Sequence, residues 1–132
     1  MNAKAKLDSN TLLAIDAARC GETAFNEASS DKNSILSYSG KEWKIQLDYL
    51  LERAILEEIK SKSNYPILSE ESECEQRYAS HYWIIDPLDG SANCLRGIPI
   101  YAISIALWDK DQPVLGVVLD LITSELFYGS DV

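Results

Sequence analysis

The spacing of apolar residues changes once along this chain, near residue 80, and that change limits the folds open to it. Before residue 80, apolar residues recur every three or four positions, which is the period of an amphipathic helix. After it, they alternate or run continuously in short segments separated by turn residues, as in β-strands. The order predicts an α+β fold, with helices packed on one mostly antiparallel sheet.

Two helices are predicted in the first part of the chain. The first covers about residues 10–29 and follows N-cap candidates at positions 8–10. The serine-rich polar stretch over residues 29–43 predicts a loop. The second helix covers about residues 44–62 and "SNYP" ends it. Each helix has one apolar face, formed by Leu13, Ala17, Cys20 and Ala24 in the first and by Leu47, Leu51, Ile55 and Ile59 in the second.

Strands are predicted at "YWII", "YAISIALW", "VLGVVLD" and "ELFYG", after a short apolar strand start at "IL" near residue 67. The connections between the last three strands are short, which favours an antiparallel meander. With the helices, these strands predict a single domain over residues 1–132, which is long enough for a modest core.

Composition excludes several classes of protein. The formal net charge of −9 argues against nucleic acid as the main partner. The N-terminal segment has no long apolar run, so we expect neither a signal peptide nor a membrane anchor. Three cysteines without a CxxC pair indicate free thiols in a cytoplasmic protein, and a single histidine, His81, argues against a zinc site.

Two aspartates at the end of an apolar strand indicate a metal site. Asp86 and Asp89 are separated only by Pro87 and Leu88, and carboxylates are the ligands that a hard cation such as Mg²⁺ prefers. Gly90 permits a close backbone approach, and free amides at the start of a short helix after it would suit a phosphate. Metal-assisted phosphoryl chemistry is one interpretation. Asp-Pro and Asp-Gly as ordinary turn residues are the alternative.

Two further acidic positions are less specific taken alone. Glu70 and Glu71 follow a short apolar segment, and a bare Glu-Glu pair is typical of a solvated loop. Asp48 is expected at the start of the second helix, where the helix dipole alone favours a negative charge.

Taken together, these motifs resemble the inositol monophosphatase family of magnesium-dependent, lithium-sensitive phosphatases. The resemblance rests on "WIIDPLDGSAN", on "LSEES", on Asp48, and on the strand segments "IPIYAISIALW", "PVLGVVLD" and "ELFYG". It runs from about residue 10 to the end of the chain. It implies the N-terminal half of the inositol monophosphatase-like sugar-phosphatase fold and hydrolysis of a small phosphorylated alcohol such as inositol monophosphate.

The resemblance also implies metal ligands. Glu70, Asp86 and the Leu88 carbonyl would hold one Mg²⁺, and Asp86 and Asp89 would contribute to a second. The metal ions would polarise the phosphoryl group and stabilise the leaving alkoxide.

Catalytic and phosphate-binding roles follow from the same resemblance. Glu70 and the Ser91 hydroxyl would orient and activate the attacking water. Backbone amides of Gly90 and Ser91 would hold phosphate oxygens, and Asp48 would be a supporting carboxylate near the site.

This chain departs from the family pattern in length and at two positions of the signature. Ser91 stands for the commoner threonine and keeps the hydroxyl, whereas Cys94 replaces an aromatic residue, so we expect a packing change there. The family's second half, with its Trp-Asp motif, has no counterpart in this chain. We therefore expect an incomplete active site and self-association, such as a homodimer, through apolar surface that the missing half would cover.

Two other functions remain open. A phosphatase of this superfamily could instead act on a 3′-phosphoadenosine nucleotide or a fructose bisphosphate, because the specificity residues lie mostly in the missing half. A non-catalytic, dimerising module that keeps the metal-binding segment is the alternative of another class.

Overall fold

The computed structural model describes residues 8–30, 40–69 and 80–131. Its helices are α1 (Ser9–Ser30), α3 (Gly40–Lys62) and the short α4 (Ser91–Leu95). Its strands are β1 (Ile67–Ser69), β2 (His81–Asp89), β3 (Ala102–Asp109), β4 (Gln112–Asp120) and β5 (Leu126–Ser130).

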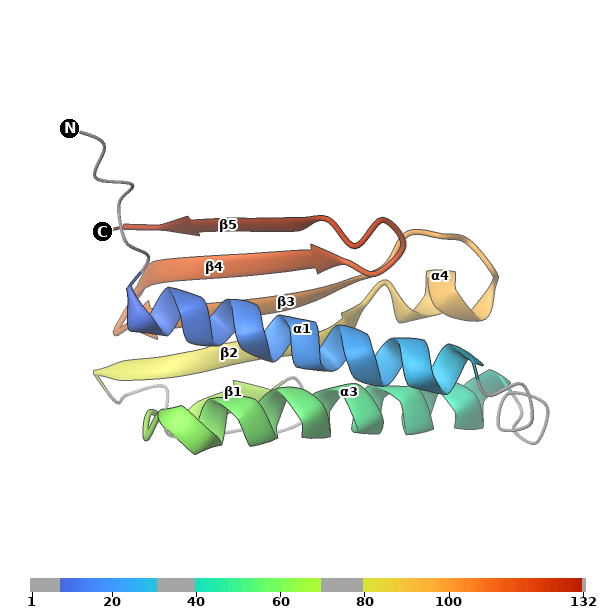
Figure 1. Ribbon diagram of the computed structural model, residues 1–132, viewed down its shortest axis with the longest axis horizontal. Coiled ribbons are helices and arrows are strands. Elements are labelled where there is room, and N and C mark those ends of the chain that lie inside the picture. Colours follow the sequence, from blue (N-terminus) through green and yellow to red (C-terminus); the bar gives the residue numbers. More distant parts are fainter. Residues whose placement is uncertain (1–7, 31–39, 70–79, 132) are drawn as a thin grey trace.

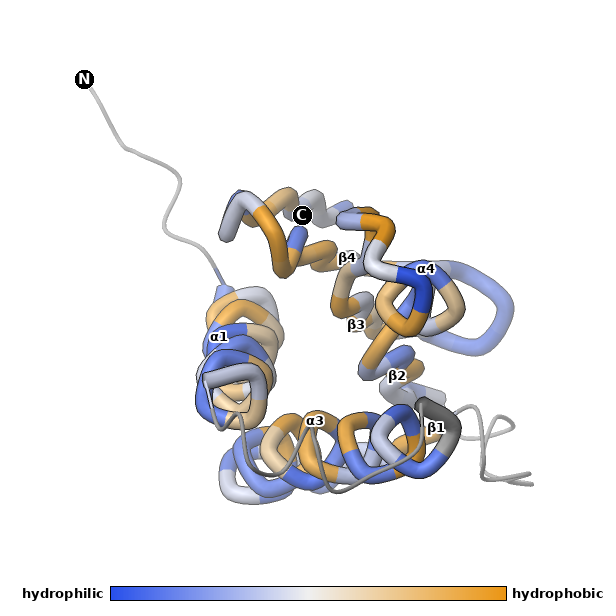
Figure 2. Tube along the Cα trace, turned by 90° about the vertical axis from the view of Figure 1, so that its right-hand side faces the viewer, coloured by the Kyte–Doolittle hydropathy of each residue, from blue (hydrophilic) through white to orange (hydrophobic). Residues whose placement is uncertain are grey.

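The five strands form one sheet in chain order, β1-β2-β3-β4-β5. β1 pairs with β2 in parallel, and every later pairing is antiparallel. α1 and α3 lie side by side on one face of this sheet, as Figures 1 and 2 show. The predicted α+β class, with two helices on a mostly antiparallel sheet, is confirmed.

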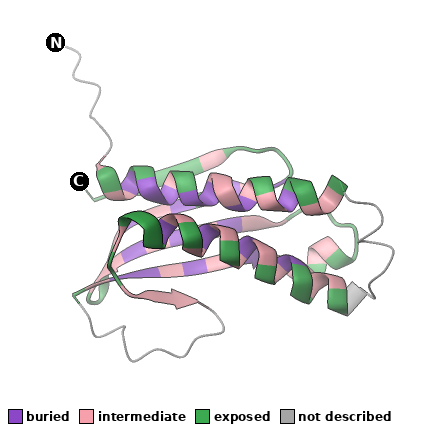
Figure 3. Cartoon of the chain, turned by 60° about the horizontal axis from the view of Figure 1, so that its bottom comes forward, coloured by how far each residue is buried: buried purple, intermediate pink, exposed green. Residues whose placement is uncertain are grey.

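The core lies between the helices and the sheet (Figure 3). The predicted apolar face of α3 is fully buried, and every second residue of β3 and β4 faces it. The inward residues of the two strands are Ile103, Ile105, Leu107, Leu115, Val117 and Leu119. Within the described residues, no helix is long and apolar enough to cross a membrane.

Small residues on α1 allow that helix to approach both of its neighbours. Ala14, Ala17 and Ala18 are fully buried. A Cβ atom added at Gly21 would lie 2.7 Å from the Ile103 side chain and 3.0 Å from that of Ile55. Because a distance under about 3 Å forces a neighbour to move, Gly21 fixes how closely α1, α3 and the sheet pack.

The start of α3 differs from the prediction. Gly40–Trp43 belong to the helix rather than to a loop. Glu42 lies in the first turn, where the helix dipole favours a negative charge, and Trp43 packs against the core. Tertiary packing therefore outweighs the polar composition of this stretch.

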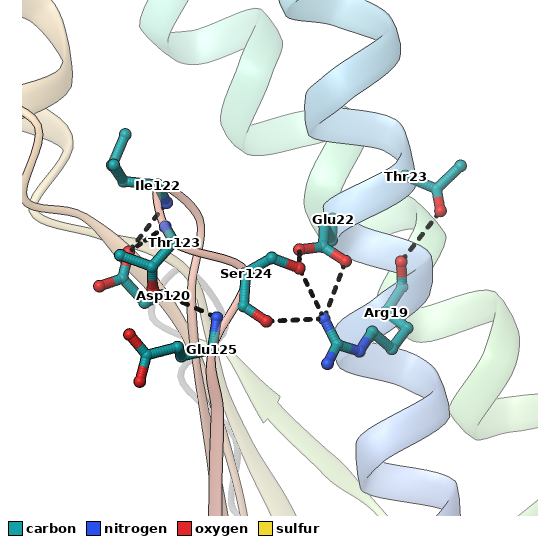
Figure 4. A network of polar contacts seen from close by, with 8 residues as sticks. All are labelled: Arg19, Glu22, Thr23, Asp120, Ile122, Thr123, Ser124 and Glu125. Atoms are coloured by element: carbon teal, nitrogen blue, oxygen red, sulfur yellow. Dashed lines mark hydrogen bonds and ion pairs between the residues drawn. The ribbon is translucent and has the colours of Figure 1, made fainter.

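A polar network ties the hairpin between β4 and β5 to α1 (Figure 4). The Arg19 guanidinium donates to the backbone oxygen and the hydroxyl of Ser124, at 3.1 and 3.0 Å, and to Glu22 at 3.0 Å. The Ser124 hydroxyl donates to Glu22 at 2.6 Å. Asp120 accepts the amides of Ile122 and Thr123, which shapes the turn. The turn is therefore held against the helix layer.

Asp8 is the N-cap of α1. Its carboxylate accepts the Thr11 amide at 2.9 Å and the Thr11 hydroxyl at 2.7 Å. These hydrogen bonds, the amide first, lower the pKa of Asp8. A lowered pKa means that the ionised form stabilises the fold above the ordinary aspartate pKa and that this contribution disappears as pH falls through the folded-state value.

We expect Asp8→Ala to lower the free energy of unfolding by about 1 kcal/mol at pH 7 because the cap is lost. The difference from the unsubstituted chain should shrink as the pH falls below the ordinary pKa of aspartate and Asp8 becomes protonated. Urea denaturation at several pH values measures both effects. An equal loss at every pH would contradict the assignment of the cap to the ionised carboxylate.

Candidate functional site

β2 does not end where the sequence predicted. The expected strand stopped at Ile85 and placed Asp86 and Asp89 in a turn, whereas the observed strand continues to Asp89. Asp86 lies opposite Ser104, and Asp89 lies opposite Ala102. A regular ladder would put Leu88 opposite Ala102, so β2 contains one extra residue at this point, a β-bulge. Pro87 has no amide to donate, and a bulge is one of the few places in a sheet that accepts it.

The bulge turns both aspartates to the same face of the sheet. In a regular strand, residues three apart point to opposite faces. Ile85 and Leu88 are three apart and are both buried in the core, at 1% and 5% exposure. The intervening extra residue has therefore reversed the alternation, and Asp86 and Asp89 share the face turned away from the helices.

Asp86 and Asp89 differ in their surroundings. The Oδ1 atom of Asp86 is buried, whereas Asp89 is exposed at the end of the strand. A buried carboxylate oxygen beside a second carboxylate on the same face is a donor set that suits a hard divalent cation. These two residues therefore fit a metal ion such as Mg²⁺.

Gly90 forms the sharp corner between β2 and α4. Its φ of 83° lies in the left-handed region, and an added Cβ would lie 2.7 Å from the backbone oxygen of Ile100. The Asn93 side chain donates to that same oxygen at 2.9 Å, and the Ile98 amide donates to the Asn93 backbone oxygen at 2.8 Å. Asn93 thus closes the loop that carries α4, a role the sequence did not reveal.

We expect Gly90→Ala to lower the free energy of unfolding by about 2 kcal/mol, because it adds both a clash and left-handed strain. Gly97→Ala is a matched control. Gly97 also has a positive φ, 71°, but nothing lies within 4 Å of an added Cβ. We expect Gly97→Ala to lower the free energy of unfolding by about 1 kcal/mol, from left-handed strain alone. Equal decreases in the free energy of unfolding, measured by thermal or urea denaturation, would show that the Ile100 backbone oxygen does not clash with a side chain at position 90.

Asp48 lies on α3, the helix that contacts α4, but not at the start of that helix. Because α3 begins at Gly40, Asp48 is more than two turns in, and the dipole explanation does not apply. Lys44, one turn earlier, lies 3.3 Å from its carboxylate. α3 contacts α4, and the charge of Asp48 is one of the causes that raise the pKa of the Cys94 thiol on that short helix.

Cys94 occupies a packed position. Burial first, and then the Asp48 charge, raise the pKa of its thiol, although a hydrogen bond from Tyr101 acts in the opposite direction. The Tyr101 ring lies against Phe25 of α1, with centroids 5.5 Å apart. A raised pKa disfavours the thiolate, which is the reactive form of a cysteine.

Glu70 and Glu71 lie outside the described residues, so the structure neither places them near Asp86 nor separates them from it. Among residues 8–30, 40–69 and 80–131, no three Asp, Glu, His or Cys side chains gather as a metal cluster would require. Of the predicted site residues, the structure thus describes the pair on β2, the Gly90 corner with Ser91, and Asp48.

The three tryptophans pack within the fold. Trp83 is fully buried, Trp43 lies against the core, and Trp108 stacks on Tyr82 with centroids 6.5 Å apart. His81 stacks on Tyr65 at the far end of β2 from Asp89. None of these aromatic residues belongs to the site.

The chain is similar in sequence to known phosphatases and to proteins named Nus factor SuhB. A profile described as the inositol monophosphatase family matches residues 6–132. An inositol-1-monophosphatase from Rhizobium meliloti is 44% identical over 84 residues, which are 62% of this chain and 32% of that protein. A Nus factor SuhB from Xylella fastidiosa is 36% identical over 97 residues, 73% of this chain and 35% of that protein. Another relative, from Pyrococcus furiosus, is named fructose-1,6-bisphosphatase and is 36% identical over 94 residues, 71% of this chain and 36% of that protein.

Solved structures share the fold. CysQ from Bacteroides thetaiotaomicron, described as a bacterial member of the inositol monophosphatase family, superposes with a TM-score of 0.81 at 28% identity. The superposition covers 92% of this chain and 46% of that one. This chain therefore spans about a third to a half of the length of the relatives it matches.

Proposed function

This chain belongs to the inositol monophosphatase family, and from that premise we propose that it is the metal-binding half of a magnesium-dependent phosphomonoesterase. The observation that carries the proposal is the bulge in β2, which turns Asp86 and Asp89 to one face beside the Gly90 corner. If Asp86 and Asp89 were only turn residues, the pairing of β2 with β3 would not need a bulge that turns both carboxylates to one face.

The proposed metal ligands are Asp86, Asp89, the Leu88 carbonyl and Glu70. Leu88 supports this role because the register gives it no partner on β3, although its side chain is in the core. Bound Mg²⁺ would supply charge to polarise the phosphoryl group and to lower the pKa of a bound water. The chain's own part is to hold two acidic oxygens on a rigid strand, where they need no rearrangement to bind a cation.

The proposed phosphate contacts are the amides of Gly90 and Ser91. The left-handed Gly90 brings the backbone around a tight corner directly after the carboxylates. The Ser91 hydroxyl and Glu70 would orient the attacking water, and Asp48, on the helix that contacts α4, would be a supporting carboxylate. In-line attack by water requires no covalent intermediate on the chain.

The substrate class is a small phosphorylated alcohol, with inositol monophosphate as the first candidate. The names of the relatives include inositol-1-monophosphatase and fructose-1,6-bisphosphatase, so a sugar bisphosphate is the alternative, with a 3′-phosphoadenosine nucleotide as a third substrate. Free thiols at Cys20 and Cys94 support a cytoplasmic location.

Apolar residues are exposed on the sheet face opposite the helices, where another protein surface could cover them. Val118 and Phe127 pair across β4 and β5 and are 43% and 58% exposed. Exposed apolar neighbours on one face are typical of an interface. We propose that a chain of this length self-associates through this face, and that full activity needs the remaining length that its relatives have.

Titration calorimetry tests the metal site. We expect the chain to bind Mg²⁺ and Asp86→Asn to weaken binding by at least about tenfold, because a charged ligand is lost. Asp111→Asn is the matched control, since Asp111 is an exposed aspartate in the turn between β3 and β4. Equal Mg²⁺ binding by all three proteins would overturn the proposed site.

Phosphate release from inositol 1-phosphate, measured in the same buffer, separates the functions. Turnover that Asp86→Asn abolishes would show that this half carries a working catalytic centre. Metal binding without turnover would assign catalysis to the longer family chain, and it is also the result that the non-catalytic module predicts. Adding the C-terminal half of a longer family member as a separate chain distinguishes an enzyme half from a non-catalytic module, because only the enzyme half would gain activity.

Self-association has its own test. We expect Phe127→Asp to shift the chain toward monomer in sedimentation velocity, because a charge on the exposed face is costly to bury. Tyr65→Asp is the control, since Tyr65 is 37% exposed and lies beside His81, away from β4 and β5. An equal shift in both variants would assign self-association to something other than this face.

A further inference from the structure

β5 lies at one edge of the sheet. Among the described residues it is the last strand and pairs with β4 alone (Figure 1). At one end of this pairing, the Glu125 backbone oxygen accepts the Asp120 amide at 2.9 Å. At the other end, the Asp131 amide donates to the Val114 backbone oxygen at 2.9 Å. Residues 125 and 131 therefore turn their backbone groups toward β4.

The alternation between these two ends identifies the backbone groups at the open edge. Successive residues of an antiparallel strand turn their N–H and C=O groups to opposite sides. Leu126, Tyr128 and Ser130 therefore direct their N–H and C=O groups away from β4. If a second β5 paired here in antiparallel fashion about Tyr128, Leu126 would lie opposite Ser130 of the second copy. This register uses every one of these outward groups on both strands.

The sequence of β5 lacks the features that usually prevent an edge strand from pairing. These features are proline, charged side chains, bulges and very short length. Leu126–Ser130 reads LFYGS, with neither proline nor charge, and its pairing with β4 contains no bulge. At the opposite edge, β1 has only three residues. β5 is therefore the edge of this sheet that is better suited to accept a strand.

The side chains on the outer face are self-complementary in the same register. Phe127 is 58% exposed, whereas nothing lies within 4 Å of a Cβ added at Gly129. Antiparallel pairing about Tyr128 sets Phe127 opposite Gly129 of the second copy, so that each ring covers bare backbone. A five-residue edge is smaller than a standard stable interface of about 1,600 Å², so this apolar contact has to add to the hydrogen bonds.

We propose that the chain dimerises by antiparallel pairing of its β5 with β5 of a second copy, which joins the two sheets into one. The inference rests on the self-association proposed above and specifies the partner and its register. A two-fold axis at Tyr128 makes the contact the same for both copies and closes the assembly at two chains.

The register also places like charges together at both ends of the pairing. Glu125 would lie opposite Asp131 of the second copy, and like charges directly opposite each other destabilise a strand pair. Because salt screens exposed charges, the dimer should strengthen as the salt concentration rises. A dimer held by apolar contacts on the sheet face alone would not depend on the charge at position 125.

Sedimentation velocity over a range of concentrations tests the register. We expect Glu125→Lys to tighten the dimer about tenfold, because a lysine opposite Asp131 replaces repulsion by attraction at both ends. Glu57→Lys is the matched control, since it makes the same charge change on α3, where Glu57 is 69% exposed. We expect this control to leave the dimer affinity unchanged.

Tyr128→Pro tests the backbone hydrogen bonds. It removes an amide at the open edge and none that β4 uses, so the fold should be retained, which circular dichroism checks. We expect the dimer to weaken at least about tenfold, whereas Tyr128→Thr, which keeps the amide, should weaken it less. If the proline variant does not fold, the charge variant still decides the register.

The outcomes separate this inference from the proposals on which it builds. A chain that is monomeric at every concentration would overturn both the self-association and the pairing of β5. A dimer that neither Glu125→Lys nor a folded Tyr128→Pro alters would keep self-association through the sheet face and overturn the edge pairing. Hydrogen-exchange protection of β5 only after addition of the C-terminal half of a longer family member would assign the edge to that half and also overturn it. Mg²⁺ binding is independent of these results, because Asp86 and Asp89 lie on β2.

Discussion

One extra residue in β2 decides where two carboxylates point. Without it, Asp89 would face the helices and Leu88 would face away from them. With it, Leu88 enters the core at 5% exposure, and Asp86 and Asp89 lie on one face. The burial of Leu88 thus stabilises the arrangement that the proposed metal site needs, because regularising the strand would expose a leucine and bury a carboxylate.

The remaining elements bring supporting groups to the same end of β2. α3 carries Asp48 to α4 on the helix that also provides the fully buried Leu47, Leu51, Ile55 and Ile59. α1 approaches closely because of Gly21, and this places Phe25 against Tyr101. The rigid helix and sheet layers therefore position a short segment, residues 90–95, that has little stability of its own.

Periodicity predicted the two long helices, the buried face of α3 and the strands after residue 80, because each pattern is local to its element. On α1, the predicted Leu13 and Ala17 are buried, whereas Cys20 and Ala24 are only half-buried. Periodicity failed at two places where contacts between residues far apart in the sequence determine the local structure. Gly40–Trp43 are polar in composition but become helical as Trp43 packs on the core. "DPLDG" has the composition of a turn, and only its pairing with β3 shows that it is a bulge. The closeness of Asp48 to Cys94 likewise depends on how α3 packs, which residue spacing does not show.

If the bulge serves a metal site, Asp86 and Asp89 must share one cation. A double-mutant cycle on Mg²⁺ affinity, with Asp86→Asn, Asp89→Asn and the double variant, tests this most directly. When two carboxylates bind the same ion, the double variant should lose much less affinity than the sum of the two single losses. Fully additive losses would contradict a shared ion and, with it, the role assigned to the bulge in β2.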